Sequence, residues 1–144
     1  MAIYLDNLVG LKIATIDLSA YIEAITLTQT LDEIETTTMG STSRTYAAGL
    51  ENSTLSVDFL NDWAASKVQA TLQAAYGTSV TALIVPVRAA SSTTISATNP
   101  LYTVSIFINN LTPVGTGGPG DFARSSMTFT CTSTVAYATS GTFN

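Results

Sequence analysis

The densest group of chemically active side chains is the acidic stretch LDEIE at residues 31–35, which holds Asp32, Glu33 and Glu35. On an extended strand, Glu33 and Glu35 lie on one face and Asp32 lies on the other. Two carboxylates on one face can bind Ca²⁺ or act as the acid and base of a hydrolase. No nearby residue in the sequence completes either site, so an acidic surface in contact with solvent is the favoured interpretation.

Two further patterns fail as reactive sites. The chain has no histidine and a single cysteine, Cys131, so it has neither the usual base for a thiol nucleophile nor a Cys/His zinc site. The stretch GTGGPGDF at 115–122 has the glycine spacing of a phosphate loop, but Asp121 stands where lysine is required. We therefore expect no catalytic residue, metal or cofactor, and a protein that is not an enzyme.

Composition limits the partners and the compartment. The 144 residues carry a net charge of −5, and the five basic residues are scattered singly, which disfavours tight binding to nucleic acid. Only 10% of residues are charged, against about 25% in typical soluble proteins, and Ser and Thr fill the polar positions. The longest apolar run, at 82–87, is too short to span a membrane, and the first ten residues show no signal-peptide pattern. We expect folding in the cytoplasm as one domain over residues 1–144.

Alternation of apolar and polar residues predicts short strands at 11–16, 22–31, 54–59, 79–88, 101–111 and 125–134. Asp58 lies on the polar face of the clearest of them, opposite Leu55, Val57 and Phe59. A helix is predicted from a cap at Asn61 or Asp62 to Gly77, with Trp63, Val68 and Leu72 packed against the sheet. The fold class is therefore mainly β, a β-sandwich or partly closed barrel with one flanking α-helix.

Two segments lack clear periodicity. Residues 39–49, MGSTSRTYAAG, are predicted to form a long loop between two strands, and loops of this length are functional or disordered. The final residues, 135–144, are expected to be a flexible tail.

The order of these pieces resembles the major tail proteins, or tail tube proteins, of long-tailed, non-contractile bacteriophages. The resemblance spans about residues 13–129 and lies chiefly in DEIETTTMGSTSRTYAAGL, the following strand with NDWAA, and NPLY. It implies a tail-tube fold, shared with the inner tube of the type VI secretion system. It also implies hexameric rings that stack into a hollow tube through which the genome leaves.

The resemblance further implies roles for particular residues. The loop at 39–49, with Met39, Arg44, Tyr46 and Gly49, would contact a neighbouring subunit or ring. Asp32, Glu33, Glu35 and Asp58 are the candidates for an acidic lumen through which DNA slides without specific binding, although strand alternation prevents all four from facing inward. The protein would belong to the virion tail, be assembled in the host cytoplasm, and contact tail tip, tape measure and tail terminator proteins but no membrane.

Two other classes of function remain open from the sequence. One is a different structural virion protein, such as a capsid decoration or tail-completion protein. The other is a carbohydrate-binding β-sandwich, for which Trp63 and a few tyrosines are the available aromatic residues.

Overall fold

The structure, a computed structural model, describes residues 8–115 and 118–144 of the chain. The elements of the first half are β1 (Gly10–Ile13), β2 (Ile16–Asp17), the short 3-10 helix η1 (Ser19–Tyr21), β3 (Ile22–Thr28), β4 (Leu31–Glu35), β5 (Tyr46–Glu51) and β6 (Thr54–Leu60). Those of the second half are α1 (Val68–Ala75), β7 (Ser79–Val85), β8 (Leu101–Phe107), β9 (Arg124–Cys131) and β10 (Ala136–Ala138).

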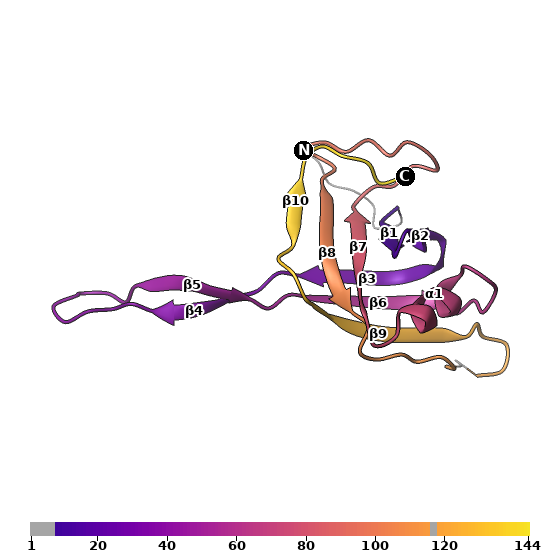
Figure 1. Cartoon of the computed structure of the whole chain (residues 1–144), viewed down its shortest axis with the longest axis horizontal. Coiled ribbons are helices and arrows are strands. Elements are labelled where there is room, and N and C mark those ends of the chain that lie inside the picture. Colours follow the sequence, from indigo (N-terminus) through magenta and orange to yellow (C-terminus); the bar gives the residue numbers. More distant parts are fainter. Residues whose placement is uncertain (1–7, 116–117) are drawn as a thin grey trace.

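One large antiparallel sheet organises the molecule. Its strand order is β2-β1-β7-β8-β9-β6-β3, and β10 pairs with β8 beside this path. Strands β4 and β5 form a separate two-stranded sheet that projects from the rest of the molecule, here called the body (Figure 1). The prediction of a mainly β chain with one α-helix is confirmed, and the described residues form no closed barrel.

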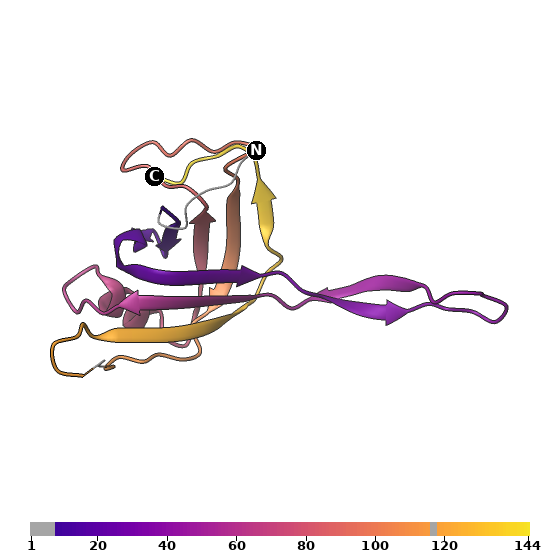
Figure 2. The same ribbon diagram turned by 180° about the vertical axis from the view of Figure 1, so that it is seen from behind.

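The large sheet changes direction at β8. One edge of β8 pairs with β7 along its length, whereas the other edge pairs with β10 at Leu101–Thr103 and with β9 at Ile106 and Phe107. Between these ladders, Thr132 donates its backbone N–H to the Ser105 carbonyl (2.7 Å). The chain from β9 to β10 thus bends around β8, and β3, β6 and β9 run across β7 and β8 (Figures 1 and 2).

The core lies between these two groups of strands. Alternation on β6 turns Leu55, Val57 and Phe59 inward, as predicted, and β9 adds Met127 and Phe129. Helix α1 and strands β1, β7 and β8 complete this apolar cluster. The cluster explains why strands with one apolar face fold into a bent sheet: the bend brings the apolar faces together.

The helix is shorter than predicted. It runs from Val68 to Ala75, whereas the sequence pattern placed its start at Asn61 or Asp62. The Asp62 carboxylate instead accepts the backbone N–H of Ala64 (2.9 Å), and Ser66 adopts a positive φ of 60° that no helix tolerates. At the other end, Gly77 has φ 81°, as expected for the residue that stops a helix.

The C-terminal segment is packed, which contradicts the predicted flexible tail. Strand β10 pairs with β8, and Phe143 is only 1% exposed, beside Val85 and Leu101. The Lys12 ammonium donates to the Phe143 carbonyl (3.1 Å), and the Asn144 side chain accepts the Thr93 backbone N–H (2.9 Å). Two aromatic residues, Tyr137 and Phe143, in an otherwise small and polar segment were too weak a signal for this anchor.

We expect Phe143→Ala to lower the free energy of unfolding by about 3–5 kcal/mol, because it removes a fully buried aromatic ring. Phe122→Ala is the matched control: that ring is 73% exposed, so the change should stay within about 0.5 kcal/mol. Urea denaturation of both variants measures the difference. Equal stabilities for the two variants would show that the C-terminal segment is not docked.

Asp17, the last residue of β2, ties the β1–β2 hairpin to η1 and to the segment after β7. Its carboxylate accepts hydrogen bonds from Ser19 and from the Arg88 guanidinium (2.8 Å). Burial raises the pKa of the Asp17 carboxyl, but the bonds from Ser19 and the charge of Arg88 outweigh burial and hold that pKa below its ordinary 3.8. The ionised form is therefore the one that stabilises the fold.

We expect Asp17→Asn to lower stability at neutral pH. A carboxyl whose pKa falls on folding stabilises the protein above its unfolded pKa, and this contribution is lost as the pH falls through the folded pKa. The gap in urea midpoint between wild type and variant should therefore be full at neutral pH and shrink as the pH drops below 3.8. A gap that stays constant into acid would contradict the role of the charge.

Candidate functional site

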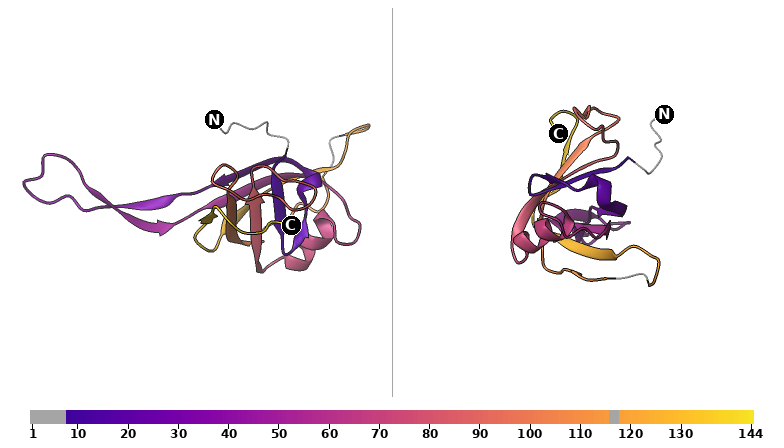
Figure 3. Two further views of the ribbon diagram at one scale, coloured as in Figure 1. Left: turned by 90° about the horizontal axis from the view of Figure 1, so that it is seen from above. Right: turned by 90° about the vertical axis from the view of Figure 1, so that its right-hand side faces the viewer.

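The most prominent feature of the surface is a long projecting hairpin, here called the arm, made of residues 29–53. Strand β4 continues from β3, and β5 leads back into β6, so both strands of the arm are directly connected to strands of the large sheet (Figures 1 and 3). At the base of the arm, the Asn52 backbone N–H donates to the Thr30 carbonyl (2.7 Å). Just beyond the end of β4, toward the tip, the Thr36 backbone N–H donates to the Thr45 carbonyl (2.8 Å). The arm is thus a paired ribbon with no second layer against it.

The arm corrects the predicted loop at 39–49. Of the four residues named for that loop, Tyr46 and Gly49 lie in β5, whereas Met39 and Arg44 lie in the connection between the strands. Residues 33–35 form the end of β4, and residues 36–38 lead into the tip of the hairpin. The sequence pattern did not reveal β5 because YAAGLE is short and rich in Ala and Gly, which are weak strand formers, and none of its residues is buried.

A bulge sets the base of the arm. The register passes from Leu31↔Glu51 to Glu33↔Ala48, so one residue of β4 opposes two of β5 at this point. Gly49 lies against Asp32: a Cβ at Gly49 would be 2.9 Å from the Asp32 Cβ and 3.0 Å from its carbonyl oxygen. Only glycine allows the two backbones this close an approach.

The arm exposes apolar side chains on a ribbon that buries none of them. Of the eleven large hydrophobic residues exposed in the described part of the chain, five belong to the arm: Leu31, Ile34, Met39, Tyr46 and Leu50. Leu50 is 81% exposed and Met39 is fully exposed. Met39 and Tyr46 were predicted from the sequence as contact residues, but Leu31, Ile34 and Leu50 were not, since their only signal is apolar residues interleaved with acidic ones.

The charges of the arm are also open to solvent. Asp32, Glu33 and Glu35 all lie on β4 and are exposed. The guanidinium of Arg44 lies 3.9 Å from the Glu35 carboxylate, with both side chains largely exposed, so this ion pair contributes little to stability. The fourth acidic candidate, Asp58, lies elsewhere: it is on β6 in the body, where its carboxylate accepts the Ser126 hydroxyl. The structure therefore separates the predicted acidic group into an arm set and Asp58.

Trp63 does not pack between helix and sheet. It precedes α1, is 54% exposed, and donates its indole N–H to the Pro113 carbonyl (3.1 Å). Val68 and Leu72, predicted for the same role, are fully buried in the core. The helical spacing that linked Trp63 to them does not apply, because the helix begins only at Val68.

The side chains with reactive potential lie apart. Within residues 8–115 and 118–144, no three His, Cys, Asp or Glu residues gather as metal ligands. Burial, with the nearby charge of Glu51, raises the pKa of the Cys131 thiol above its ordinary value, which keeps the thiol protonated at neutral pH. Residues 116 and 117 of the stretch at 115–122 lie outside the described ranges. The first seven residues, which bear on the signal-peptide prediction, also lie outside them. No described helix is long and apolar enough to cross a membrane.

The sequence matches no family model, and a search of curated proteins finds no significant relative. The function must therefore be argued from the geometry of the arm and the body.

We expect Gly49→Val to unpair the arm and leave the body intact, because the added side chain would force β5 away from Asp32. Amide hydrogen exchange should be faster by about tenfold or more at Thr36 and unchanged at Val57. Ala48→Val is the control, since Ala48 is exposed and valine suits a strand there. Unchanged protection of Thr36 in the Gly49 variant would contradict the close approach.

Proposed function

We propose that the protein is a structural virion protein that self-assembles into stacked hexameric rings, forming the tail tube of a long-tailed, non-contractile bacteriophage. The observation that carries the proposal is the arm, which leaves Leu31, Ile34, Met39, Tyr46 and Leu50 uncovered in the isolated chain. Hexamers and the tube itself come from the resemblance of the sequence to that family. The genome would pass through this tube, and the tail tip, tape measure and tail terminator proteins would be its partners.

The energetics of the arm favour a partner. A two-stranded hairpin with no layer against it is marginally stable in water. Burying a Leu, Ile or Met side chain contributes about 1.5–3 kcal/mol, so covering a few of these residues would add stability that the hairpin lacks on its own. Isolated exposure of one such residue is common, but five on one ribbon mark an interaction surface.

The position of the arm allows assembly into a ring or a tube. It leaves one end of the body (Figure 1), so a copy that receives it elsewhere on the body can make head-to-tail contacts. Such head-to-tail contacts close into rings or continue as filaments. The bent sheet with α1 against it also agrees with the sandwich and flanking helix that the resemblance implies.

The outer face of β3, β6 and β9 supports the second part of the proposal, a lumen that does not hold DNA. It presents small polar side chains, including Ser56, Ser126 and Thr128, with Asp58 among them. Arg124 also lies on this face at the start of β9, but its guanidinium is paired with Glu23 and Asp121. A face of hydroxyls with a carboxylate and a neutralised guanidinium offers little attraction to phosphates. Asp58 is accordingly our candidate for the lumen, whereas Asp32, Glu33 and Glu35 go with the arm to the subunit contact.

A carbohydrate-binding protein is the second candidate, and one observation favours it. The exposed ring of Trp63 borders a shallow hollow of about 240 Å³ with Gln69, Gln73 and Pro113. Sugars bind such combinations of an aromatic face and side-chain amides. Titration of Trp63 fluorescence with a panel of oligosaccharides distinguishes this candidate from assembly.

We expect the purified chain, when concentrated, to form rings or hollow tubes of uniform diameter under the electron microscope. Leu50→Asp and Ile34→Asp should remain folded by circular dichroism but monomeric by sedimentation, because a carboxylate cannot be buried unpaired at the contact. Val114→Asp is the control: Val114 is exposed like Leu50 but lies outside the arm, so assembly should persist. Wild-type protein that stays monomeric at every concentration would refute the proposal.

A further inference from the structure

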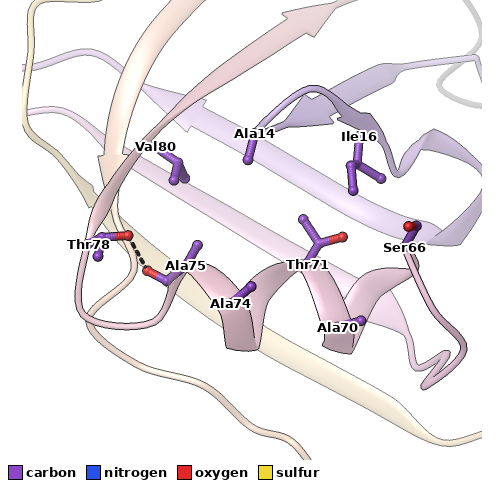
Figure 4. A pocket seen from close by; sticks show the side chains of 9 residues that line it. All are labelled: Ala14, Ile16, Ser66, Ala70, Thr71, Ala74, Ala75, Thr78 and Val80. Carbon is purple, nitrogen blue, oxygen red and sulfur yellow. Dashed lines mark hydrogen bonds between the residues drawn. The ribbon is translucent and has the colours of Figure 1, made fainter.

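An open groove of about 410 Å³ lies between α1, the β1–β2 turn and the start of β7 (Figure 4). Its lining is mostly small and apolar, and includes Ala14, Ile16, Ala70, Ala74 and Val80. A second hollow of about 290 Å³ continues from it, sharing Ala14 and Val80 and extending to Lys12. A groove of this size and lining is better filled by a single unbranched side chain on a narrow turn than by the broad surface of another protein.

The groove also contains an unsatisfied polar group. Thr71 lines it from α1 (Figure 4) and is only 6% exposed, yet its hydroxyl has no hydrogen-bond partner in the described part of the chain. A buried hydroxyl without a partner is costly, and such groups are normally satisfied by water or by another molecule. In addition, Ala14 and Ser66 on the groove both adopt positive φ values that are rare outside glycine.

The tip of the arm presents a side chain of the matching kind. The Ser41 backbone N–H donates to the Thr38 carbonyl (3.2 Å), which closes a four-residue turn. Gly40 at its third position has φ 89°, as in a type II turn, and Met39 at its second position projects with its side chain fully exposed. Methionine is unbranched and adaptable, so it suits an irregular apolar groove.

Charge and position point to the same pairing. The arm carries four acidic residues, Asp32, Glu33, Glu35 and Glu51, against one basic residue, Arg44. Lys12 lies beside the groove and Lys67 adjoins its Ser66, and neither lysine forms an ion pair within the described residues. The helix and the β1–β2 turn lie at the end of the body away from the arm (Figure 1), so a chain does not fill its own groove.

We propose that this groove is the acceptor site for the arm tip of a second copy of the chain, with the Met39 side chain seated between α1 and the β1–β2 turn. The inference rests on the proposed self-assembly and specifies its contact. It makes the contact head-to-tail: each copy gives its tip to one neighbour and receives a tip from another. The acidic arm then lies beside Lys12 and Lys67 of the receiving copy.

Cysteine cross-linking tests the contact directly. Protein with Met39→Cys is mixed with protein carrying Ala74→Cys, both in a Cys131→Ser background, and oxidised where the wild type assembles. We expect disulfide-linked dimers from the mixture, and a ladder of linked chains when one chain carries both substitutions. Gln73→Cys, one residue away on α1 and outside the groove lining, is the control and should cross-link about tenfold less, since a disulfide needs close Cβ atoms. Equal linking at Gln73, or linking of Met39→Cys only to itself, would overturn the proposal.

Filling the groove gives an independent test. Ala74→Phe should raise the protein concentration needed for assembly by about tenfold or more, while Gln73→Phe adds the same ring outside the groove and should not. Met39→Ser leaves the groove intact and should act like Ala74→Phe, which guards against misfolding of the helix variant. Wild-type protein that never assembles overturns both proposals. Wild-type assembly that neither Ala74→Phe nor Met39→Ser affects overturns the groove alone.

Discussion

Pairing of β6 along both edges is the constraint on which the rest of the molecule depends. Its register with β3 on one side and β9 on the other fixes which residues face inward, and Leu55, Val57 and Phe59 then form the centre of the core. A slip of one residue would exchange them for Thr54, Ser56 and Asp58 and bury polar groups. The same strand continues from the arm, so the direction of the arm is fixed by the packing of the body.

A buried polar network joins this strand to the helix. At the end of β6, the Asn61 side chain accepts hydrogen bonds from Gln69 (2.7 Å) and Ser125 (2.6 Å), and Ser125 shares its hydroxyl with the Thr112 carbonyl (2.7 Å). The short helix has no side-chain cap, so these bonds and the burial of Val68 and Leu72 hold it in place. Helix and arm are thus carried at opposite ends of one strand pair, which makes the body a rigid spacer between them.

Sequence patterns predicted the strands that bury one face. They failed where the buried residues do not recur with the period of a strand or a helix. Alternation located β6, β8 and β9 because each has an inward apolar row. Residues 39–49 of the arm were predicted to be a loop because neither face of the arm is buried, so nothing selects an alternating pattern there. Trp63 was assigned to the core because helical spacing was extended across Ser66, whose positive φ is invisible in the sequence. The anchor at Phe143 depends on contacts with Val85 and Leu101, far away in the chain.

An exposed hairpin with apolar side chains is ordinarily an aggregation hazard, because its open edges pair with other chains. Here the exposed apolar residues are interleaved with Asp32, Glu33 and Glu35, whose like charges repel when two arms align side by side. Two arms therefore repel one another, whereas an arm and the uncharged groove flanked by lysines do not repel one another. In the proposed assembly, the acidic residues of β4 would select the partner surface, because they disfavour arm-to-arm pairing and so favour a head-to-tail contact that covers Met39 and its neighbours.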